Sequence, residues 1–304
     1  MYSQPWSPVP STTAEAPELR LALATVRAAA ALVREQYARP GLGVYEKADH
    51  TPLTDADLAA DRLIRGRVAA AFPADALLTE ETADDPARLA NRRVWVADPI
   101  DGTRQFVERT GEFDVYLALV HDGRPVVGVA AHPPSGQLLW ATEGGGAWIA
   151  QDGATRPLRF PPAEPGRPPR VVTSHYHGAP GTLPLLARAA ERAGFAPPIS
   201  LPIGFQPHAF VDPATGQPRY ELFAGPGRDV DGVNVSGSEW DFAAADVILH
   251  EAGGAFTDVR GRRFAYNKPD PRNRGGILAA TDPALHQRFL AALAAELPPP
   301  ADTP

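Results

Sequence analysis

The chain has 304 residues, of which 44% are hydrophobic and 8% aromatic, enough to bury the core of a large globular domain. Its formal net charge of -7 disfavours a nucleic-acid polymer or an anionic membrane surface as a partner. The absence of cysteine excludes disulfides, thiolate metal sites and cysteine nucleophiles. No segment approaches the roughly 18 apolar residues of a membrane span, and no basic segment precedes an apolar run near Met1, so we expect a cytoplasmic protein.

Two amphipathic helices are predicted near the start of the chain. Thr12 and Glu15 have the spacing of a capping box, and apolar residues then recur every three or four positions over residues 19–37. The second helix begins at Thr54, where Asp57 repeats the capping spacing, and its apolar stripe ends before a proline. In both helices the apolar residues lie on one face, which indicates that this face packs on the hydrophobic core.

An antiparallel sheet is predicted after these helices. A short apolar strand at residues 76–78 leads into Glu80 and Glu81, and a polar loop follows over residues 83–93. Further apolar runs separated by turns predict a meander over residues 94–97, 114–120, 125–131 and 137–141.

The rest of the chain has the pattern of an α/β half. After a proline-rich segment, strand, helix and strand patterns alternate over residues 171–173, 183–193 and 199–203. We therefore expect flexible tails at residues 1–13 and 297–304 and a single domain over residues 14–296. Its N-terminal half is expected to extend to about residue 160 and its C-terminal half to begin at about residue 170.

Residues 210–238 are rich in Gly, Asp and Pro. We expect them to form a long irregular connection that contains one strand at residues 220–223, and such connections often line a site. Ser238 and Asp241 then have the spacing of a second capping pair and predict the start of another helix.

Residues 98–103, with the sequence Asp-Pro-Ile-Asp-Gly-Thr, form a predicted strand-to-helix junction. Pro99 fixes φ, and Gly102 allows backbone N–H groups near the helix start to approach an anion closely. An Asx turn explains either Asp98 or Asp101 alone but poorly explains both. The stretch therefore predicts a site for metal and phosphate.

Other carboxylates also lie at the ends of predicted elements, namely Asp57, Glu80, Glu81 and Asp241. Each has a structural alternative, because an acid in the first turn of a helix is commonly a cap and an acid at a strand end is commonly solvated. If the acids converge, hard oxygen ligands without cysteine select Mg²⁺ or Mn²⁺. The nearest thing to a histidine pair that could bind a metal is His175 with His177, and the alternative is a solvated role or a role at the rim of a substrate site. A phosphate monoester suits Mg²⁺ held beside a helix N-terminus, so we predict phosphoester hydrolysis.

The order of these motifs resembles the inositol monophosphatase superfamily of magnesium-dependent, lithium-sensitive phosphatases. The matching stretches are Lys47 with residues 54–57, and residues 79–81, 98–103, 240–244 and 251–254. The resemblance covers most of the chain and implies an α+β fold, a five-layer α-β-α-β-α sandwich of the sugar phosphatase type. It also implies two or three Mg²⁺ ions, replaceable by Mn²⁺, whose ligands are Glu80, Asp98, Asp101, Asp241 and the carbonyl of Ile100.

The same resemblance implies the catalytic roles. Thr103 orients and deprotonates the attacking water with help from Asp57 or Glu80, and Asp57 lies behind the ligands or at a third ion. The N–H groups of Gly102 and Thr103 hold the phosphate. Lys47 is expected near phosphate or metal-bound water, because it is one of only two lysines in a chain that otherwise uses arginine. Water would attack in line, without a covalent phosphoenzyme.

The substrate is predicted from weaker signals. Residues 104–106 and 109–113 resemble the branch that removes the 3′-phosphate of adenosine 3′,5′-bisphosphate, a 3′(2′),5′-bisphosphate nucleotidase, and residues 171–175 suit that branch as well. We expect His175 at the substrate and Arg228 either on a second phosphate or solvated. Residues 210–238, where the leaving group should be recognised, depart from the pattern. An inositol phosphate, or another sugar or histidinol phosphate, is the alternative substrate.

Two other classes of function remain open. A non-catalytic phosphate-binding regulatory protein would have lost a ligand or Thr103, and no member of the expected set is missing. A structural or interaction protein would explain the proline-rich segments but not the acids at successive element ends. A small phosphorylated metabolite is thus the expected partner, without nucleic acid or membrane, and a homodimer is left open.

Overall fold

The computed structural model describes residues 16–48, 50–175, 181–212, 215, 217–230 and 233–297. The expected capping pair Thr12 and Glu15, as well as His177 and the predicted tail over residues 1–13, lie outside this part of the chain. Among the described residues, no helix combines the length and the apolar character that crossing a membrane requires.

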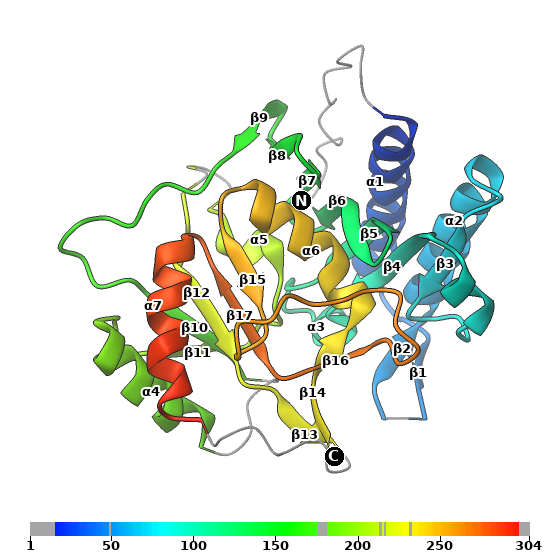
Figure 1. Cartoon of the computed structure of the whole chain (residues 1–304). Helices are drawn as coiled ribbons and strands as arrows, with labels where there is room; N and C mark the ends of the chain where they lie inside the picture. The colour runs from blue at the N-terminus through cyan, green and yellow to red at the C-terminus, as the bar shows by residue number, and fades with distance from the viewer. Residues whose placement is uncertain are drawn as a thin grey trace.

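The N-terminal half is a seven-stranded sheet with two helices on one face (Figure 1). The helices are α1 (Pro17–Ala38) and α2 (Asp55–Ala71), which begin and end close to the predicted positions. The strands, in spatial order, are β3 (Ala76–Thr79), β4 (Arg93–Asp101), β5 (Asp114–His121), β6 (Arg124–His132), β7 (Gln137–Thr142), β8 (Gly146–Gln151) and β9 (Ala154–Leu158). Within this sheet only β3 pairs in parallel, with β4. Strands β4 to β7 form the predicted antiparallel meander, and β8 and β9 extend it beyond the prediction.

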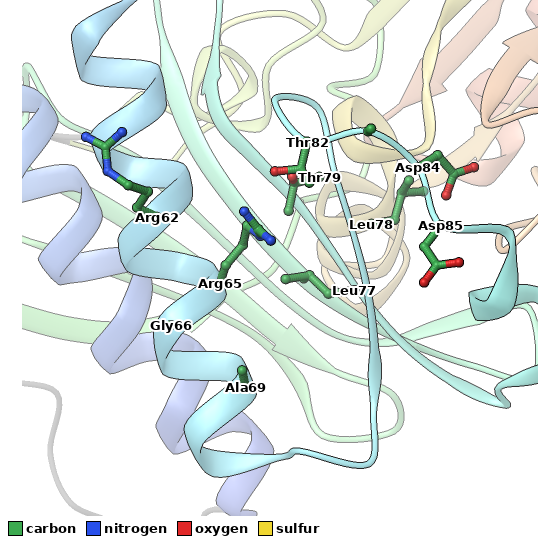
Figure 2. A pocket seen from close by; sticks show the side chains of 11 residues that line it. Arg62, Arg65, Gly66, Ala69, Leu77, Leu78, Thr79, Thr82, Asp84 and Asp85 are labelled. Carbon is green, nitrogen blue, oxygen red and sulfur yellow. The ribbon is translucent and has the colours of Figure 1, made fainter.

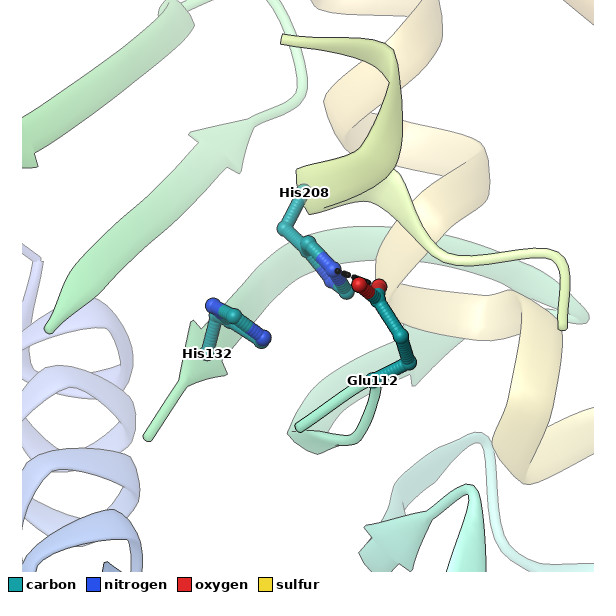
Figure 3. A group of neighbouring side chains, drawn as sticks. All are labelled: Glu112, His132 and His208. Carbon is teal, nitrogen blue, oxygen red and sulfur yellow. Dashed lines mark hydrogen bonds and ion pairs between the residues drawn. The ribbon is translucent and has the colours of Figure 1, made fainter. Parts of the chain in front are cut away.

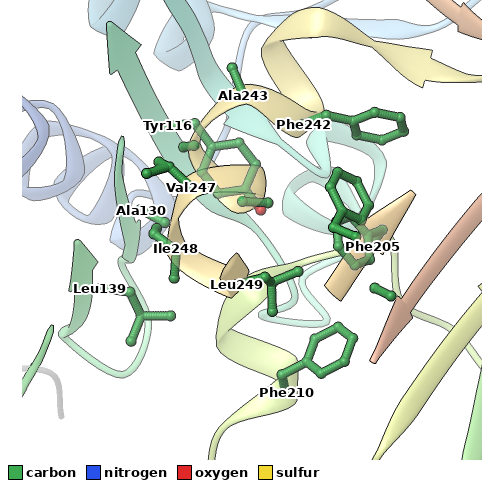
Figure 4. Close-up of a cluster of buried hydrophobic side chains, with 14 of the residues drawn as sticks. Tyr116, Ala130, Leu139, Phe205, Phe210, Phe242, Ala243, Val247, Ile248 and Leu249 are labelled. Atoms are coloured by element: carbon green, nitrogen blue, oxygen red, sulfur yellow. The ribbon is translucent and has the colours of Figure 1, made fainter. Parts of the chain in front are cut away.

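A central helix covers the other face of this sheet. This helix, α6 (Glu239–Glu251), carries Val247, Ile248 and Leu249 into a cluster with Tyr116 of β5 and Leu139 of β7 (Figure 4). Because helices cover both faces, β5 is buried at every residue except the last, as a continuous apolar run requires. The end of β4 and the first turn of α6 border the same pocket.

The C-terminal half supplies two further layers. Its five-stranded sheet consists, in spatial order, of β11 (Ile199–Leu201), β10 (Val171–Ser174), β12 (Leu222–Gly225), β17 (Ile277–Ala280) and β15 (Ala255–Thr257). Helices α4 (Thr182–Ala193) and α7 (Pro283–Ala294) pack on its outer face around Phe289, while its inner face meets α6 through Phe223 and Phe256. The result is the expected α-β-α-β-α sandwich.

The segment over residues 210–238 is more regular than its composition indicated. Besides β12 it contains β13 (Arg228–Val230) and β14 (Val233–Ser238), which form a three-stranded sheet with β16 (Arg272–Arg274). The strand expected at residues 220–223 is present as β12, shifted by two residues. The expectation that the rest of the segment is irregular was wrong, because Gly and Asp disfavour strands on average but did not prevent this pairing. Residues 83–93, predicted as a loop, include the 3₁₀ helix η1 (Pro86–Ala90).

Short elements complete the fold. The hairpin of β1 (Val44–Glu46) and β2 (Pro52–Thr54) precedes α2, and the one-turn helix α5 (Pro207–Phe210) follows β11. A short helix, α3 (Thr103–Val107), begins directly after β4. None of the three was predicted with its bounds, although a helix start near residue 103 was.

Candidate active site

The expected strand-to-helix junction is present, but β4 does not end at Asp98. It continues to Asp101, and its register with β5 shifts between Asp98 opposite Tyr116 and Asp101 opposite Asp114. Pro99 lies inside this irregularity, where a missing N–H does not interrupt a regular ladder. The shift brings both aspartates to the same edge of the sheet.

The carboxylates from distant parts of the chain converge there. Ligand atoms of Asp98, Asp101 and Asp241 all lie within 4.8 Å of one another. Glu80 follows β3, which pairs in parallel with β4, so Glu80 reaches the same edge as Asp98. All four acids border one pocket of about 350 Å³, together with Ile100, Gly102 and Thr103. The sequence thus identified the residues that the fold brings together.

Asp57 and Asp241 each cap a helix. Asp241 also borders the pocket, and Asp57 contacts Thr103, which borders it. One carboxylate oxygen of Asp57 accepts the backbone N–H of Thr54 at 2.8 Å and its hydroxyl at 2.5 Å. The other oxygen of Asp57 accepts the hydroxyl of Thr103 at 3.1 Å. Oδ2 of Asp241 accepts the N–H of Ser238 at 2.6 Å. The capping alternative is therefore correct without excluding a role in the site, because each carboxylate has a second oxygen.

Lys47 lies in the turn of the β1–β2 hairpin, and its side chain reaches two glutamates that follow β3. Its Nζ donates to Glu80 at 2.7 Å and to Glu81 at 2.8 Å. Burial lowers the pKa of Lys47, but the charges and hydrogen bonds of the two glutamates outweigh it and raise the pKa above its usual value. Lys47 therefore stays protonated and offsets negative charge beside the acid cluster.

The acids repel one another in a buried site. Burial is the largest cause that raises the pKa of Asp98 and of Asp101 well above the usual range, and neighbouring acids raise both values further. Burial and the charge of Glu80 raise the pKa of Asp241 to about 7. Such a group is stable in ionised form only with a cation, and the all-oxygen donor set fits Mg²⁺ or Mn²⁺.

Mg²⁺ is expected to stabilise the protein more at about pH 8 than at about pH 5.5. Burial raises the pKa of Asp57 to about 6 and that of Asp241 to about 7, so without metal the contribution of these carboxyls is present below about pH 4 and is lost as pH rises through 6 to 7. A bound cation favours the ionised carboxylates and reverses this loss. Thermal unfolding with Mg²⁺ or chelator at both pH values measures the difference, and an equal Mg²⁺ shift at both would contradict the expectation.

Gly102 is held in a conformation and a space that admit only glycine. Its φ is 95°, and a Cβ there would lie 2.7 Å from the carbonyl oxygen of Glu112 and 3.1 Å from Nε2 of Gln206. Gln206 is buried and itself reaches the carbonyl oxygens of Asp101 and Glu112, each at 3.3 Å. The turn is therefore fixed by a residue that lies about 100 positions later.

We expect Gly102→Ala to destabilise the protein by about 2 to 4 kcal/mol, since backbone strain and a contact with a carbonyl act together. Gly111→Ala is a matched control, because Gly111 has a φ of 84° but a Cβ added there would meet no atom within 4 Å. Denaturant unfolding measures both changes. Equal destabilisation by the two variants would show that the close approach at Gly102 is unimportant.

The predicted substrate residues are less well placed. His175 is exposed at the end of β10, where its Nδ1 contacts the hydroxyl of Ser200, and it does not border the pocket. Arg228 lies on β13, and its side chain is outside the described part of the structure. The pocket is instead completed by Thr51, Pro52, Arg104, Gln105 and Gly204. Of these five residues, only Arg104 and Gln105 lie in a stretch that the sequence singled out. The other three reach the pocket through tertiary contacts, which local sequence patterns do not reveal.

A second pocket, of about 580 Å³, lies between α2 and the end of β3 with the loop after it (Figure 2). Arg62 and Arg65 border it on the helix side, and Asp84 and Asp85 on the loop side. Asp84 is paired with Arg88, at 2.6 Å, and no group of metal-binding acids converges there among the described residues. This pocket therefore lacks the chemistry of the first.

Comparison with known proteins gives the same family as the motifs. A model of the inositol monophosphatase family matches residues 15–192 and 227–297. A histidinol-phosphatase from Chlorobaculum parvum is 32% identical over 91% of this chain and 96% of its own length. The 3′(2′),5′-bisphosphate nucleotidase CysQ of Escherichia coli K12 is also 32% identical, over 74% of this chain and 83% of its own.

Solved structures show the same fold. CysQ from Bacteroides thetaiotaomicron, a bacterial member of the inositol monophosphatase family, has a TM-score of 0.68 and 25% identity, covering 87% of this chain and 97% of its own. The suhB protein of Bartonella henselae has a TM-score of 0.69 and 22% identity, covering 91% and 98%. The match of the family model to both halves of the sequence, together with the two relatives at 32% identity, establishes that the chain belongs to the inositol monophosphatase family.

Proposed function

We propose that this phosphatase is a magnesium-dependent phosphomonoesterase that acts on a small phosphorylated metabolite. The observation that carries the proposal is the convergence of Asp98, Asp101 and Asp241, from β4 and α6, on one pocket. Glu80 and the carbonyl of Ile100 complete a set of oxygen donors at the same pocket. These residues would hold two or three Mg²⁺ ions, with Mn²⁺ as a substitute.

The protein residues position water and phosphate around this set. Bound Mg²⁺ supplies neutralisation of the phosphate charge and activation of water. Thr103 orients the water through its hydroxyl, which lies 3.1 Å from Asp57 and 3.0 Å from the carbonyl of Ile100. Asp57, whose pKa burial raises to about 6, accepts the proton near neutral pH, with Glu80 as the alternative acceptor. The N–H groups of Gly102 and Thr103 hold the phosphate, and Lys47 adds positive charge nearby.

The rim of the pocket favours a substrate with a second anionic group. Arg104 borders the pocket and is exposed, and no carboxylate in the described part of the chain is paired with its guanidinium. An arginine in this position can bind a second phosphate with two hydrogen bonds. We therefore place adenosine 3′,5′-bisphosphate first, with its 3′-phosphate at the metal site. The likeness to CysQ nucleotidases supports this choice.

Histidinol phosphate is the second candidate. The histidinol-phosphatase relative aligns with 91% of the chain, a larger share than the 74% aligned with CysQ of Escherichia coli. Histidinol phosphate carries a cationic amine, however, and among the described residues the acids that border the pocket are Glu80, Asp98, Asp101 and Asp241. Since we assign all four to the metal, no described acid of the pocket is left to bind that amine.

Phosphate release from four substrates tests this choice. Comparison of kcat/KM for adenosine 3′,5′-bisphosphate, histidinol phosphate, inositol 1-phosphate and fructose 1,6-bisphosphate should favour the first. Arg104→Gln should lower that value about 10- to 100-fold and change inositol 1-phosphate little. Arg109→Gln is the control, because Arg109 contacts backbone carbonyls of Tyr37 and Arg39 outside the pocket. Faster release from histidinol phosphate would overturn the first choice in favour of the second.

A further inference from the structure

A buried chain of hydrogen bonds leads from α5 to the proposed metal ligand Asp101. Nδ1 of His208 lies 2.8 Å and 2.9 Å from the two carboxylate oxygens of Asp114. The hydroxyl of Tyr116 lies 2.9 Å from Asp114 and 3.1 Å from Oδ2 of Asp101. His208, Asp114 and Tyr116 are all buried, so water does not compete for these contacts.

His208 is a cation in this arrangement. Its second ring nitrogen, Nε2, lies 3.2 Å from Glu112 (Figure 3). Since Nδ1 faces Asp114, both nitrogens face carboxylates and both must carry hydrogen. Burial alone lowers the pKa of His208, but Asp114 and Glu112 outweigh it and raise the pKa to about 9. The imidazolium therefore offsets the charge of Asp114 directly.

His132, stacked on His208 with ring centroids 3.8 Å apart, is neutral. Its Nε2 donates to the carbonyl of Gly111 at 2.8 Å, and its Nδ1 accepts the hydroxyl of Ser135 at 2.7 Å. Burial and the charge of His208 lower the pKa of His132 to about 4. The nitrogens of both rings are thus paired without any ion. Although Glu112, His132 and His208 are close enough to share a metal, the contacts describe an ion pair with a stacked neutral ring.

The charge of His208 favours one of two positions for the hydrogen of Tyr116. Tyr116 has one hydroxyl hydrogen and two acceptors, Asp114 and Asp101. Because the His208 cation offsets the charge of Asp114, Asp114 attracts the hydrogen of Tyr116 less strongly, and that hydrogen is available to Oδ2 of Asp101. A hydrogen bond to one oxygen of a carboxylate fixes its orientation and leaves the other oxygen for a cation.

We infer that His208 is a positioning residue of the metal site, which acts through Asp114 and Tyr116 on the orientation of Asp101. The inference rests on the proposed function, since it requires Asp101 to be a ligand. Of the relay residues, only Asp101 borders the pocket. Glu112 holds His208 from the other side and connects it to the loop that packs on Gly102.

Calorimetric titration with Mg²⁺ tests the relay without an activity measurement. We expect His208→Gln and Tyr116→Phe each to weaken Mg²⁺ binding about 10-fold or more, and the double variant to be no weaker than the weaker single variant. His208→Gln leaves the negative charge of Asp114 without its cation. The double variant His208→Gln/Asp114→Asn removes that charge as well, so Mg²⁺ binding should recover toward the wild-type value. A residue that only supports the fold would make this double variant worse. His286→Gln is the control, a buried histidine that contacts Thr257 in the C-terminal sheet.

The outcomes separate the inference from the proposed function. If the wild-type chain binds no Mg²⁺, the proposed function fails and the relay has no ligand to act on. If the wild type binds Mg²⁺ and His208→Gln binds it equally well, the relay alone is wrong. If Zn²⁺ binds to the wild type, is lost in Glu112→Gln and leaves Mg²⁺ binding unchanged, the histidine cluster is a metal site and the relay is again wrong.

Discussion

Asp98→Asn is expected to lower kcat/KM for phosphate release by about 10³-fold or more, because removing a ligand charge removes several kcal/mol of stabilisation from the transition state. The same variant should unfold at a higher temperature than the wild type when metal is absent. Burial and the neighbouring acids hold the pKa of Asp98 well above its usual range, so its ionised form destabilises the metal-free fold. Asparagine has a similar shape and no charge. Thermal unfolding in chelator and steady-state kinetics with Mg²⁺ measure the two effects.

Asp246→Asn provides a control of opposite sign. Asp246 is also buried, but its hydrogen bond with His250 and the charge of Arg263 outweigh burial and lower its pKa. Its replacement should therefore destabilise the protein with or without Mg²⁺ and leave the dependence of rate on Mg²⁺ unchanged. If Asp98→Asn retained full activity, or destabilised the metal-free protein as Asp246→Asn does, the assignment of Asp98 as a ligand would be wrong.

Thr103→Ala is expected to lower kcat by about 10² to 10³-fold with little change in KM, because the hydroxyl acts on water and not on bound substrate. The alanine variant keeps the backbone N–H that is proposed to hold phosphate. It removes the contacts with Asp57 and with the carbonyl of Ile100, which lie at 3.1 Å and 3.0 Å. Steady-state kinetics at saturating Mg²⁺ measures the change.

Thr103→Ser is the matched variant, since serine keeps the hydroxyl and loses only a methyl group. We expect serine to restore most of kcat. If the serine variant were as slow as the alanine variant, packing of the methyl group would explain the loss, and the proposed role of the hydroxyl would be refuted.

Local patterns in the sequence predicted the individual helices and strands and the acids at their ends, and the resemblance to the family implied the layers and the set of metal ligands. The apolar stripe over residues 19–37 and the capping spacing of Thr54 and Asp57 became α1 and α2 almost within their predicted bounds. The acids at successive element ends could be grouped because strands β3 and β4 end at one edge of a sheet. Motif order then gave the family.

The surroundings of the cluster could not be predicted because they depend on tertiary contacts. Gln206 packs on Gly102 across about 100 residues of chain, and nothing in the local pattern of either residue indicates it. His208 appears as an ordinary histidine near a proline in the sequence, yet in the fold it pairs with Asp114. Residues 210–238 were misread because their glycines and aspartates indicated loop where β13 and β14 pair.

A crystal structure of the protein soaked with Mn²⁺ and inorganic phosphate tests the metal site and the phosphate site together, because Mn²⁺ is located by its anomalous scattering. We expect Mn²⁺ between Asp98, Asp101 and Asp241, bound by their carboxylate oxygens. We also expect phosphate at the N–H groups of Gly102 and Thr103. Mn²⁺ bound only at Glu112, His132 and His208, or phosphate bound only away from the acid cluster, would contradict the proposed function.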